Sequence, residues 1–153
     1  MKGENEIPGM TELVVMQGNV EAGKKVFNDS TCATCHQVNG EGINFGPNLS
    51  KIGTKLAKIG LYEAILNPSA SVSESYQTTT VKLKDGTETM GLLNNETQTE
   101  ISLQLAGGVK RNYRMSNVAS VEKSNLSFMP ENLQRLMTVN DLADLVEYMS
   151  SLQ

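Results

Sequence analysis

Residues 32–36 read Cys32-Ala33-Thr34-Cys35-His36, and this stretch decides how the rest of the chain is interpreted. Side chains three positions apart lie on one face of a helical turn, so both thiols can reach the same flat ligand. This spacing is typical of c-type haem attachment, in which the two thiols add to the porphyrin vinyl groups as thioethers. The motif therefore predicts one covalent haem c, tethered by Cys32 and Cys35, with His36 as an axial ligand of the iron.

Three other kinds of site also use a pair of cysteines. A thioredoxin-like dithiol normally follows a buried strand, whereas residues 20–31 have the pattern of a helix. A zinc site normally has four protein ligands, and the chain has only two Cys and one His, so a carboxylate would have to be recruited. A structural disulfide would leave His36 unexplained. The sequence therefore favours haem over these three alternatives.

The length and net charge of the chain limit which classes of protein it can belong to. The 153 residues are enough for one domain with a proper core. The formal net charge is −4, so there is no basic excess to meet the phosphates of nucleic acid, and nucleic acid is not an expected partner. A redox partner protein with a positive or mixed docking surface fits this charge better. No apolar run approaches the roughly 18 residues of a transmembrane segment.

The polar stretch 1–18 is interpreted as an extended lead-in or a linker from a larger protein. It lacks the apolar core and the cleavage signature of a leader. Because haem is attached covalently outside the cytoplasm in bacteria, we expect a periplasmic or otherwise extracytoplasmic location. A leader would then have been removed, or the domain would have been excised from a longer multidomain protein.

Helices are predicted on both sides of the motif. The first begins near Asn19, a good N-cap residue, and ends at residues 28–30. Residues 37–50 form a predicted loop rich in Gly and Asn, where glycine lets the backbone approach a flat ligand closely. Two more helices are expected at about 50–58 and 60–66, the second ending before Pro68, because the residue before proline avoids the α region.

Further along the chain the apolar period changes to two, which is typical of strands. Turns are predicted at Asp85-Gly86, Asn94-Asn95 and Gly107-Gly108. A last short strand is expected from Val118 to Val121. The pattern predicts a small antiparallel sheet of four or five strands with one apolar face, over about residues 76–125.

A final helix is predicted to open at Thr138 with a capping box that is completed by Asp141. Its apolar positions recur at helical spacing. Gly23 and Phe27 on the first helix could let this last helix cross closely, with Tyr148 over the gap. Independent burial of these side chains in the general core is the alternative.

The sixth ligand of the iron must come from elsewhere in the chain. His36 is the only histidine, which excludes a bis-histidine centre within one chain. Methionine is the common alternative and raises the reduction potential. Met129 is the preferred ligand because it sits in a loop just before a proline. Met115 and Met137 are undistinguished alternatives, and Met90 is expected to pack in the core.

A ligating histidine normally donates its other N–H to a fixed acceptor, which sets ring orientation and basicity. The backbone carbonyl of Pro47 is the expected acceptor, with a simple turn proline as the alternative. Four apolar residues form the candidate haem wall, with ordinary core packing as the alternative for each: Phe45, Leu49, Ile52 and Phe128.

These features together resemble a class I c-type cytochrome. The residues that carry the resemblance are Gly23-x-x-x-Phe27, Cys32–His36, Gly46-Pro47-Asn48-Leu49, Asn67-Pro68, Met129-Pro130 and the helix Leu142–Tyr148. More closely, the chain resembles the haem-binding domain of the Planctomycetes/Verrucomicrobia type, in which a β-rich insert separates the third helix from the Met-Pro loop. Tyr76–Asn125 have that position, and Ser127–Leu133 look like the second signature of this type.

The resemblance covers about residues 19–152 and implies an α+β fold. This fold is the class I cytochrome c helical fold, with a small antiparallel β-sheet inserted between the third helix and the Met-ligand loop. The implied domain spans 19–153, with its β-rich insert at 76–125. Such domains often sit at the C-terminus of large proteins with dehydrogenase-like propellers, which implies a dehydrogenase, oxidase or other cytochrome as redox partner.

We therefore expect electron transfer rather than catalysis. The alternative is a haem enzyme or ligand sensor with a displaceable sixth ligand, for which a distal His or Arg is the usual helper. The chain has no second histidine, and Arg111, Arg114 and Arg135 are expected to be solvated or bound to a propionate. A colourless dithiol or zinc domain is the third and weakest alternative.

Overall fold

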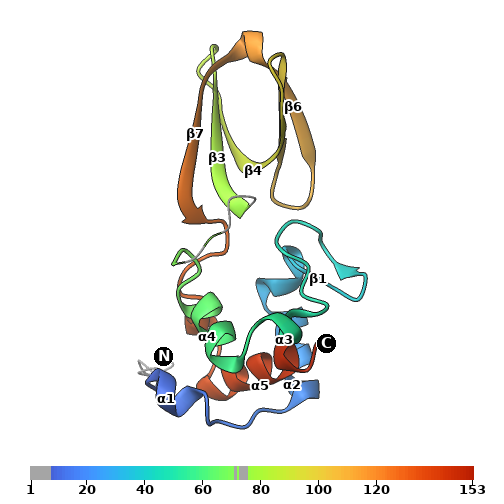
Figure 1. The fold of residues 1–153 in the computed structure, drawn as a ribbon, viewed down its shortest axis with the longest axis vertical. Coiled ribbons are helices and arrows are strands. Elements are labelled where there is room, and N and C mark those ends of the chain that lie inside the picture. Colours follow the sequence, from blue (N-terminus) through green and yellow to red (C-terminus); the bar gives the residue numbers. More distant parts are fainter. Residues whose placement is uncertain (1–7, 71, 73–75) are drawn as a thin grey trace.

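The computed structural model describes residues 8–153 except 71 and 73–75, and within them helices gather at one end while a five-stranded antiparallel sheet extends from the other (Figure 1). The helices are α1 (Met10–Leu13), α2 (Val20–Asp29), α3 (Ile52–Lys55), α4 (Lys58–Leu66) and α5 (Val139–Ser150), with 3-10 turns η1 (Thr31–Thr34), η3 (Met115–Asn117) and η4 (Leu133–Leu136). The larger sheet consists of β3 (Gln77–Leu83), β4 (Glu88–Glu96), β5 (Glu100–Gln104), β6 (Lys110–Arg114) and β7 (Val118–Ser127). The predicted α+β class is confirmed.

The close crossing of α2 and α5 holds the helical end together. A Cβ added at Gly23 would lie 1.9 Å from the backbone oxygen of Asp144, so only glycine allows this approach. The rings of Phe27 and Tyr148 meet edge-on, with centroids 5.9 Å apart. The predicted crossing is therefore confirmed, and it places the middle of α5 against the helix that precedes the haem motif.

Both predicted helix caps are present. The Asn19 side chain accepts a hydrogen bond from the Ala22 N–H at 2.8 Å, and α2 begins at the next residue. Thr138 and Asp141 form the reciprocal capping box, with N···O distances of 3.0 and 2.9 Å. The buried face of α5 then packs in the helical core with Leu142, Leu145, Val146 and Met149. Local sequence signals thus fix where α2 and α5 each begin.

The helical core also includes part of the N-terminal stretch. Met10–Leu13 form the short helix α1, and the side chain of Leu13 is only 1% exposed. This differs from the extended lead-in that was predicted for residues 1–18, of which 1–7 lie outside the described residues. The physical reason is burial: the apolar Leu13 joins the core cluster of α4 and α5 rather than staying in water.

The larger sheet has the strand order β6-β5-β4-β3-β7, so β6 and β7 are its edges. One face buries Val81, Ile101 and Leu103, as the alternation in the sequence predicts. The Tyr113 hydroxyl of β6 donates to Thr89 Oγ1 of β4 at 2.9 Å, across the intervening strand β5. The sheet is therefore curved around its own small apolar cluster, as its strands show in Figure 1.

Two details of the sheet differ from the prediction. Asn94 and Asn95 lie inside β4 at a register shift, and the turn falls at residues 97–99, where Thr97 N–H donates to Glu100 O at 2.8 Å. Strand β7 runs on to Ser127 instead of ending at residue 121. Pairing of this part of β4 with β5 overrides the local turn preference of asparagine.

Met90 is exposed, which corrects the expectation that it packs in the core. Its side chain is 55% exposed. Val81 pairs with Thr89, so Thr89 shares the apolar face and the next residue, Met90, points to the opposite face. A second, smaller sheet also forms in the predicted loop, from β1 (Gln37–Val38) and β2 (Glu41–Gly42).

Candidate haem site

The attachment motif lies on a tight turn that follows α2 directly. Ser30 N–H closes α2 on Val26 O at 2.8 Å, and η1 begins at the next residue. The backbone N–H groups of Cys35 and His36 both donate to Cys32 O, at 3.2 and 2.9 Å. Both cysteines are free and partly exposed. The disulfide alternative is therefore wrong for this structure, and two thiols are available for thioethers.

The imidazole of His36 is held by the backbone of the following loop. Nδ1 lies 2.7 Å from Pro47 O, the contact expected from the sequence. Because a backbone carbonyl can only accept, the proton resides on Nδ1, and the lone pair of Nε2 is available to a metal. Burial lowers the pKa of His36, while the hydrogen bond to Pro47 acts in the opposite direction. The ring is thereby favoured in its neutral, ligating form.

Residues 43–49 wrap around the motif through backbone hydrogen bonds. Ile43 N–H donates to Ala33 O at 3.0 Å, Gly46 N–H to Cys35 O at 2.5 Å, and Leu49 N–H to Gln37 O at 2.9 Å. A Cβ added at Gly46 would lie 2.8 Å from Cε1 of His36. Glycine at position 46 is thus needed for the loop to pass the imidazole closely. The Gly-rich composition of the loop indicates such close approach only in general terms, without pointing to this position.

An aromatic contact joins this loop to the segment that carries Met129. The rings of Phe45 and Phe128 meet edge-on at 5.3 Å between centroids. The Met129 N–H donates to Ser127 Oγ at 3.0 Å, and the Ser127 N–H donates to Ser69 Oγ at 3.0 Å. These contacts fix the Met-Pro loop at the junction between the sheet and the helices. The role of Ser127 and Ser69 has no signal in the sequence.

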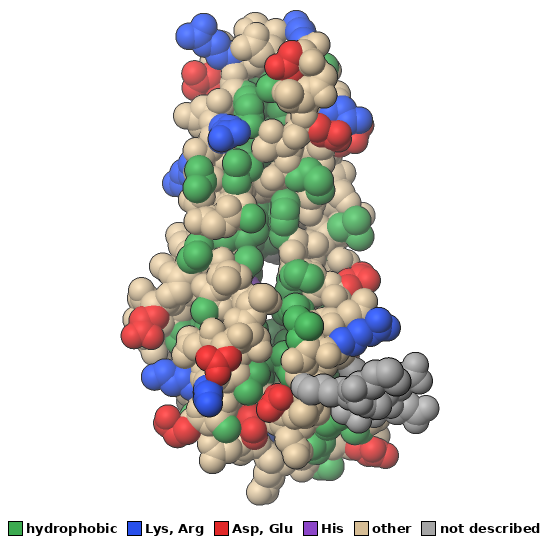
Figure 2. Space-filling model, turned by 180° about the vertical axis from the view of Figure 1, so that it is seen from behind, with side chains coloured by type: hydrophobic (Ala, Val, Ile, Leu, Met, Phe, Trp, Pro, Cys, Tyr) green, Lys and Arg blue, Asp and Glu red, His purple; other side chains and the backbone are tan. Residues whose placement is uncertain are grey.

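The predicted site residues gather around one core. Four of them pack, partly buried, against the helical cluster of α2, α4 and α5: Cys32, Leu49, Ile52 and Met129. Phe45 is buried, and Phe128 is partly buried against it. Figure 2 shows the molecule hollowed between the sheet and the helices, with hydrophobic side chains along the margins. This region offers an apolar surround next to the two thiols and the imidazole.

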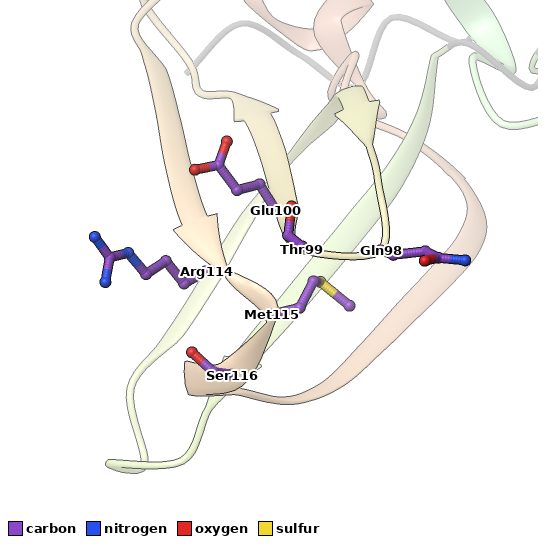
Figure 3. Close-up of a pocket in the computed structure, with 6 residues that line it drawn as sticks. All are labelled: Gln98, Thr99, Glu100, Arg114, Met115 and Ser116. Atoms are coloured by element: carbon purple, nitrogen blue, oxygen red, sulfur yellow. The ribbon is translucent and has the colours of Figure 1, made fainter.

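The alternative methionines lie in different surroundings. Met137 is only 7% exposed within the helical core. Met115 sits at the end of the sheet away from the helices, beside an open surface depression that Figure 3 shows. Its lining residues are Gln98, Thr99, Glu100, Arg114, Met115 and Ser116. This depression is remote from the attachment motif and contributes nothing to the site.

The thiol chemistry also argues against a dithiol or zinc site. Burial raises the pKa of the Cys32 thiol, helped by the neighbouring Cys35, whereas its own backbone acts to lower it. A reactive redox dithiol instead needs a lowered thiol pKa. Helix α2, not a buried strand, precedes the pair. Within the described residues there is no group of three or more His, Cys, Asp and Glu side chains that could hold a metal ion.

The donor set therefore fits a haem c. Two free thiols three residues apart flank one turn, a neutral imidazole follows them, and a backbone carbonyl orients its ring. Apolar side chains pack beside the motif, and Gly46 lets the following loop pass close to the imidazole. Across the described part of the chain, no helix is long and apolar enough to span a membrane.

Comparison with known proteins gives one match. The family model described as cytochrome c matches residues 20–98, slightly more than half of the 153 residues. The matched range covers α2, the attachment motif, the loop that holds His36, and the first strands of the larger sheet. No curated protein matches the chain.

Proposed function

The chain belongs to the cytochrome c family and so carries a covalently bound haem c, and from this premise we propose that His36 and Met129 are the axial ligands of its iron. The family functions in haem-based electron transfer. We further propose that the chain shuttles single electrons to or from a redox partner protein, such as a dehydrogenase, an oxidase or another cytochrome. Because cytochrome c domains are typically extracytoplasmic, a periplasmic or similar location is part of the proposal.

The contact between His36 and Pro47 carries this proposal. Its 2.7 Å distance fixes the imidazole tautomer, so that Nε2 is the ligating atom. The same hydrogen bond makes the ring a stronger electron donor to a metal. Cys32 and Cys35 lie on the preceding turn, with backbone bonds from Cys35 and His36 converging on Cys32 O. One short segment can therefore supply both tethers and one ligand.

Support for Met129 comes from its loop. The Phe45–Phe128 pair brings the residue before Met129 against the loop that follows His36. The hydrogen bond from Met129 N–H to Ser127 Oγ fixes its backbone, which lowers the entropic cost of holding the thioether in place. A thioether ligand opposite an imidazole raises the reduction potential of a haem iron.

The haem iron, when bound, supplies the chemistry by cycling between its ferrous and ferric states. The chain's own residues hold and surround it. Cys32 and Cys35 tether it, and His36 is oriented by Pro47. Phe45, Leu49, Ile52 and Phe128 exclude water from the iron's surroundings. A rigid apolar surround reduces the rearrangement that accompanies a change of charge. No acid–base pair is needed for such a transfer.

Two measurements on the purified protein test this function. Intact mass should exceed the mass of the polypeptide by one haem, and the Cys32→Ser, Cys35→Ser double variant should lose that increment. The reduced protein should show a low-spin Soret and α/β spectrum that does not change at once with carbon monoxide. A high-spin spectrum that responds immediately would favour an enzyme or sensor, and a colourless protein would contradict haem altogether.

A further inference from the structure

We propose that the edge strand β6 is the docking surface for an acidic redox partner protein, and that it directs this partner to the haem attachment motif. The proposal rests on the electron-transfer function argued above. Its starting point is charge: residues 101–121 contain three cations, Lys110, Arg111 and Arg114, and no Asp or Glu. The whole chain has a net charge of −4, so this stretch is a local reversal of sign. It favours an acidic partner surface over the positive or mixed one that the net charge alone suggests.

The cations of β6 are accessible. β6 pairs only with β5 and forms one edge of the larger sheet, and Lys110, Arg111 and Arg114 are all exposed. The ion pairs found within the described residues do not include them: Lys58–Glu147, Lys82–Glu88, Lys82–Glu122 and Lys123–Glu96. Glu100 stands opposite Arg114 in the register, at the far end of the strand. The uncompensated charge is thus concentrated at the Lys110 end.

The Lys110 end of β6 abuts the haem loop. The Gln104 side-chain amide donates to Asn44 O at 2.5 Å, and Gln104 is paired with Lys110 in the sheet. A Cβ added at Gly108 would lie 3.3 Å from Cγ2 of Ile43. Ile43 in turn donates its N–H to Ala33 O, inside the attachment motif. Figure 1 shows this end of the sheet lying next to the loop that contains β1.

Apolar surface adjoins the charges at the same place. Val109 is 55% exposed and Ile43 is 37% exposed. An apolar centre with a charged rim is the usual make-up of a protein–protein interface. Lys110 and Arg111 point to opposite faces of the sheet, so a partner seated on Val109 and Ile43 would meet their charges from both sides of this edge. It would then lie against the backbone of the haem motif. Complementary charge would speed its association and set its orientation.

A simpler role for the same residues is protection of the sheet edge. Lysine and arginine on an edge strand discourage pairing with another chain. Charge reversal separates the two roles, because glutamate keeps the edge charged while it inverts the attraction. The test is therefore the double variant Lys110→Glu, Arg111→Glu. Its matched control is Lys24→Glu, Lys25→Glu, which makes the same charge change at exposed positions of α2.

The first readout is electron transfer to small probes of opposite charge. At low ionic strength the reduced holoprotein gives one electron to hexacyanoferrate(III), which becomes hexacyanoferrate(II), or to the cation tris(phenanthroline)cobalt(III), which becomes cobalt(II). The β6 variant should react roughly tenfold more slowly with the anion and faster with the cation. The α2 control should change both rates far less, and high salt should remove the difference. Equal effects of the two double variants overturn the proposal.

The second readout requires no electron transfer and uses poly-L-glutamate as the acidic protein surface. Backbone amide resonances of Ile43 and Val109–Arg111 should shift on titration, and the β6 variant should lose these shifts while the α2 control keeps them. A response to hexacyanoferrate without one to poly-L-glutamate would overturn docking of a protein. Binding to vesicles of anionic phosphatidylglycerol but not to poly-L-glutamate would also overturn it. An intact mass without the haem increment would contradict the electron-transfer function alone, because the poly-L-glutamate titration reports on docking independently of haem.

Discussion

The ring of Phe128 meets the ring of Phe45 edge-on, with their centroids 5.3 Å apart and their planes at 84°. The two residues are far apart in the sequence and belong to the two loops that frame the proposed iron site. Phe45 follows the attachment motif, and Phe128 directly precedes Met129. Such aromatic pairs contribute about 0.5–1.5 kcal/mol beyond their area burial. The contact couples the segment of Met129, the proposed second ligand, to the loop that orients His36.

Replacing Met129 with alanine should lower the reduction potential and open the iron to added ligands. The reason is that a thioether stabilises ferrous iron, and alanine leaves the position vacant. Cyanide titration and redox potentiometry measure both effects. Met90→Ala is the matched control, because Met90 is 55% exposed on the outer face of the sheet. If both variants keep the parent's potential and spectrum, the assignment of Met129 is wrong.

Substitution Gly46→Ala should displace the His36 imidazole. The new Cβ would lie 2.8 Å from Cε1 and 3.0 Å from Nδ1 of that ring, so either the ring or the loop must move. The hydrogen bond to Pro47 would lengthen, and the spectrum and potential of the haem should change. Gly9→Ala, which meets no atom within 4 Å, serves as the control. An unchanged potential in Gly46→Ala would show that the loop does not position His36.

Gly23→Ala should destabilise the fold without changing the haem chemistry directly. Its Cβ would lie 1.9 Å from Asp144 O, on the backbone of α5, and backbone yields less easily than a flexible side chain. Overpacking of this kind costs about 1–3 kcal/mol and occasionally more. Denaturant unfolding of the holoprotein gives the free energy. Stability equal to the parent's would mean that α2 and α5 can separate freely.

Tyr62 should make the protein less stable at alkaline pH. Burial raises the pKa of its hydroxyl, and the Glu147 carboxylate raises it further. An unfolded tyrosine ionises near pH 10 while the folded one keeps its proton, so the unfolded chain binds fewer protons there. The stabilisation is complete below about pH 10 and is lost as the pH rises through the raised folded value. Tyr62→Phe should flatten this loss in thermal unfolding. Parallel pH profiles of stability for Tyr62→Phe and the parent would contradict this role of Tyr62.

Local signals in the sequence were sufficient for much of the helical part. The N-cap Asn19, the Thr138–Asp141 capping box and the helix break before Pro68 all depend on residues close together in the chain, and the structure has all three. The spacing within Cys32–His36 likewise predicts covalent haem attachment. In these places the physics that fixes the structure acts within one or two helical turns.

The crossing of α2 and α5 was predicted, but other contacts between distant segments were not. Leu13 is buried by residues of α4 and α5, and nothing in the polar stretch around it marks that destination. Asn94 and Asn95 favour a turn locally, yet pairing keeps them inside β4. The bond from Gln104 to Asn44 joins residues 60 positions apart and has no periodic signature. Such contacts depend on how elements pack, which single-residue preferences do not encode.

Proton NMR of the reduced holoprotein tests the axial pair most directly. A methionine methyl group bound to low-spin ferrous haem lies over the porphyrin, and the ring current moves its resonance far outside the range of other methyl groups. The account predicts one such methyl signal in the parent, present in Met90→Ala and Met137→Leu and absent in Met129→Ala. A parent spectrum without this signal, or a signal that survives in Met129→Ala, would contradict ligation of the haem iron by His36 and Met129.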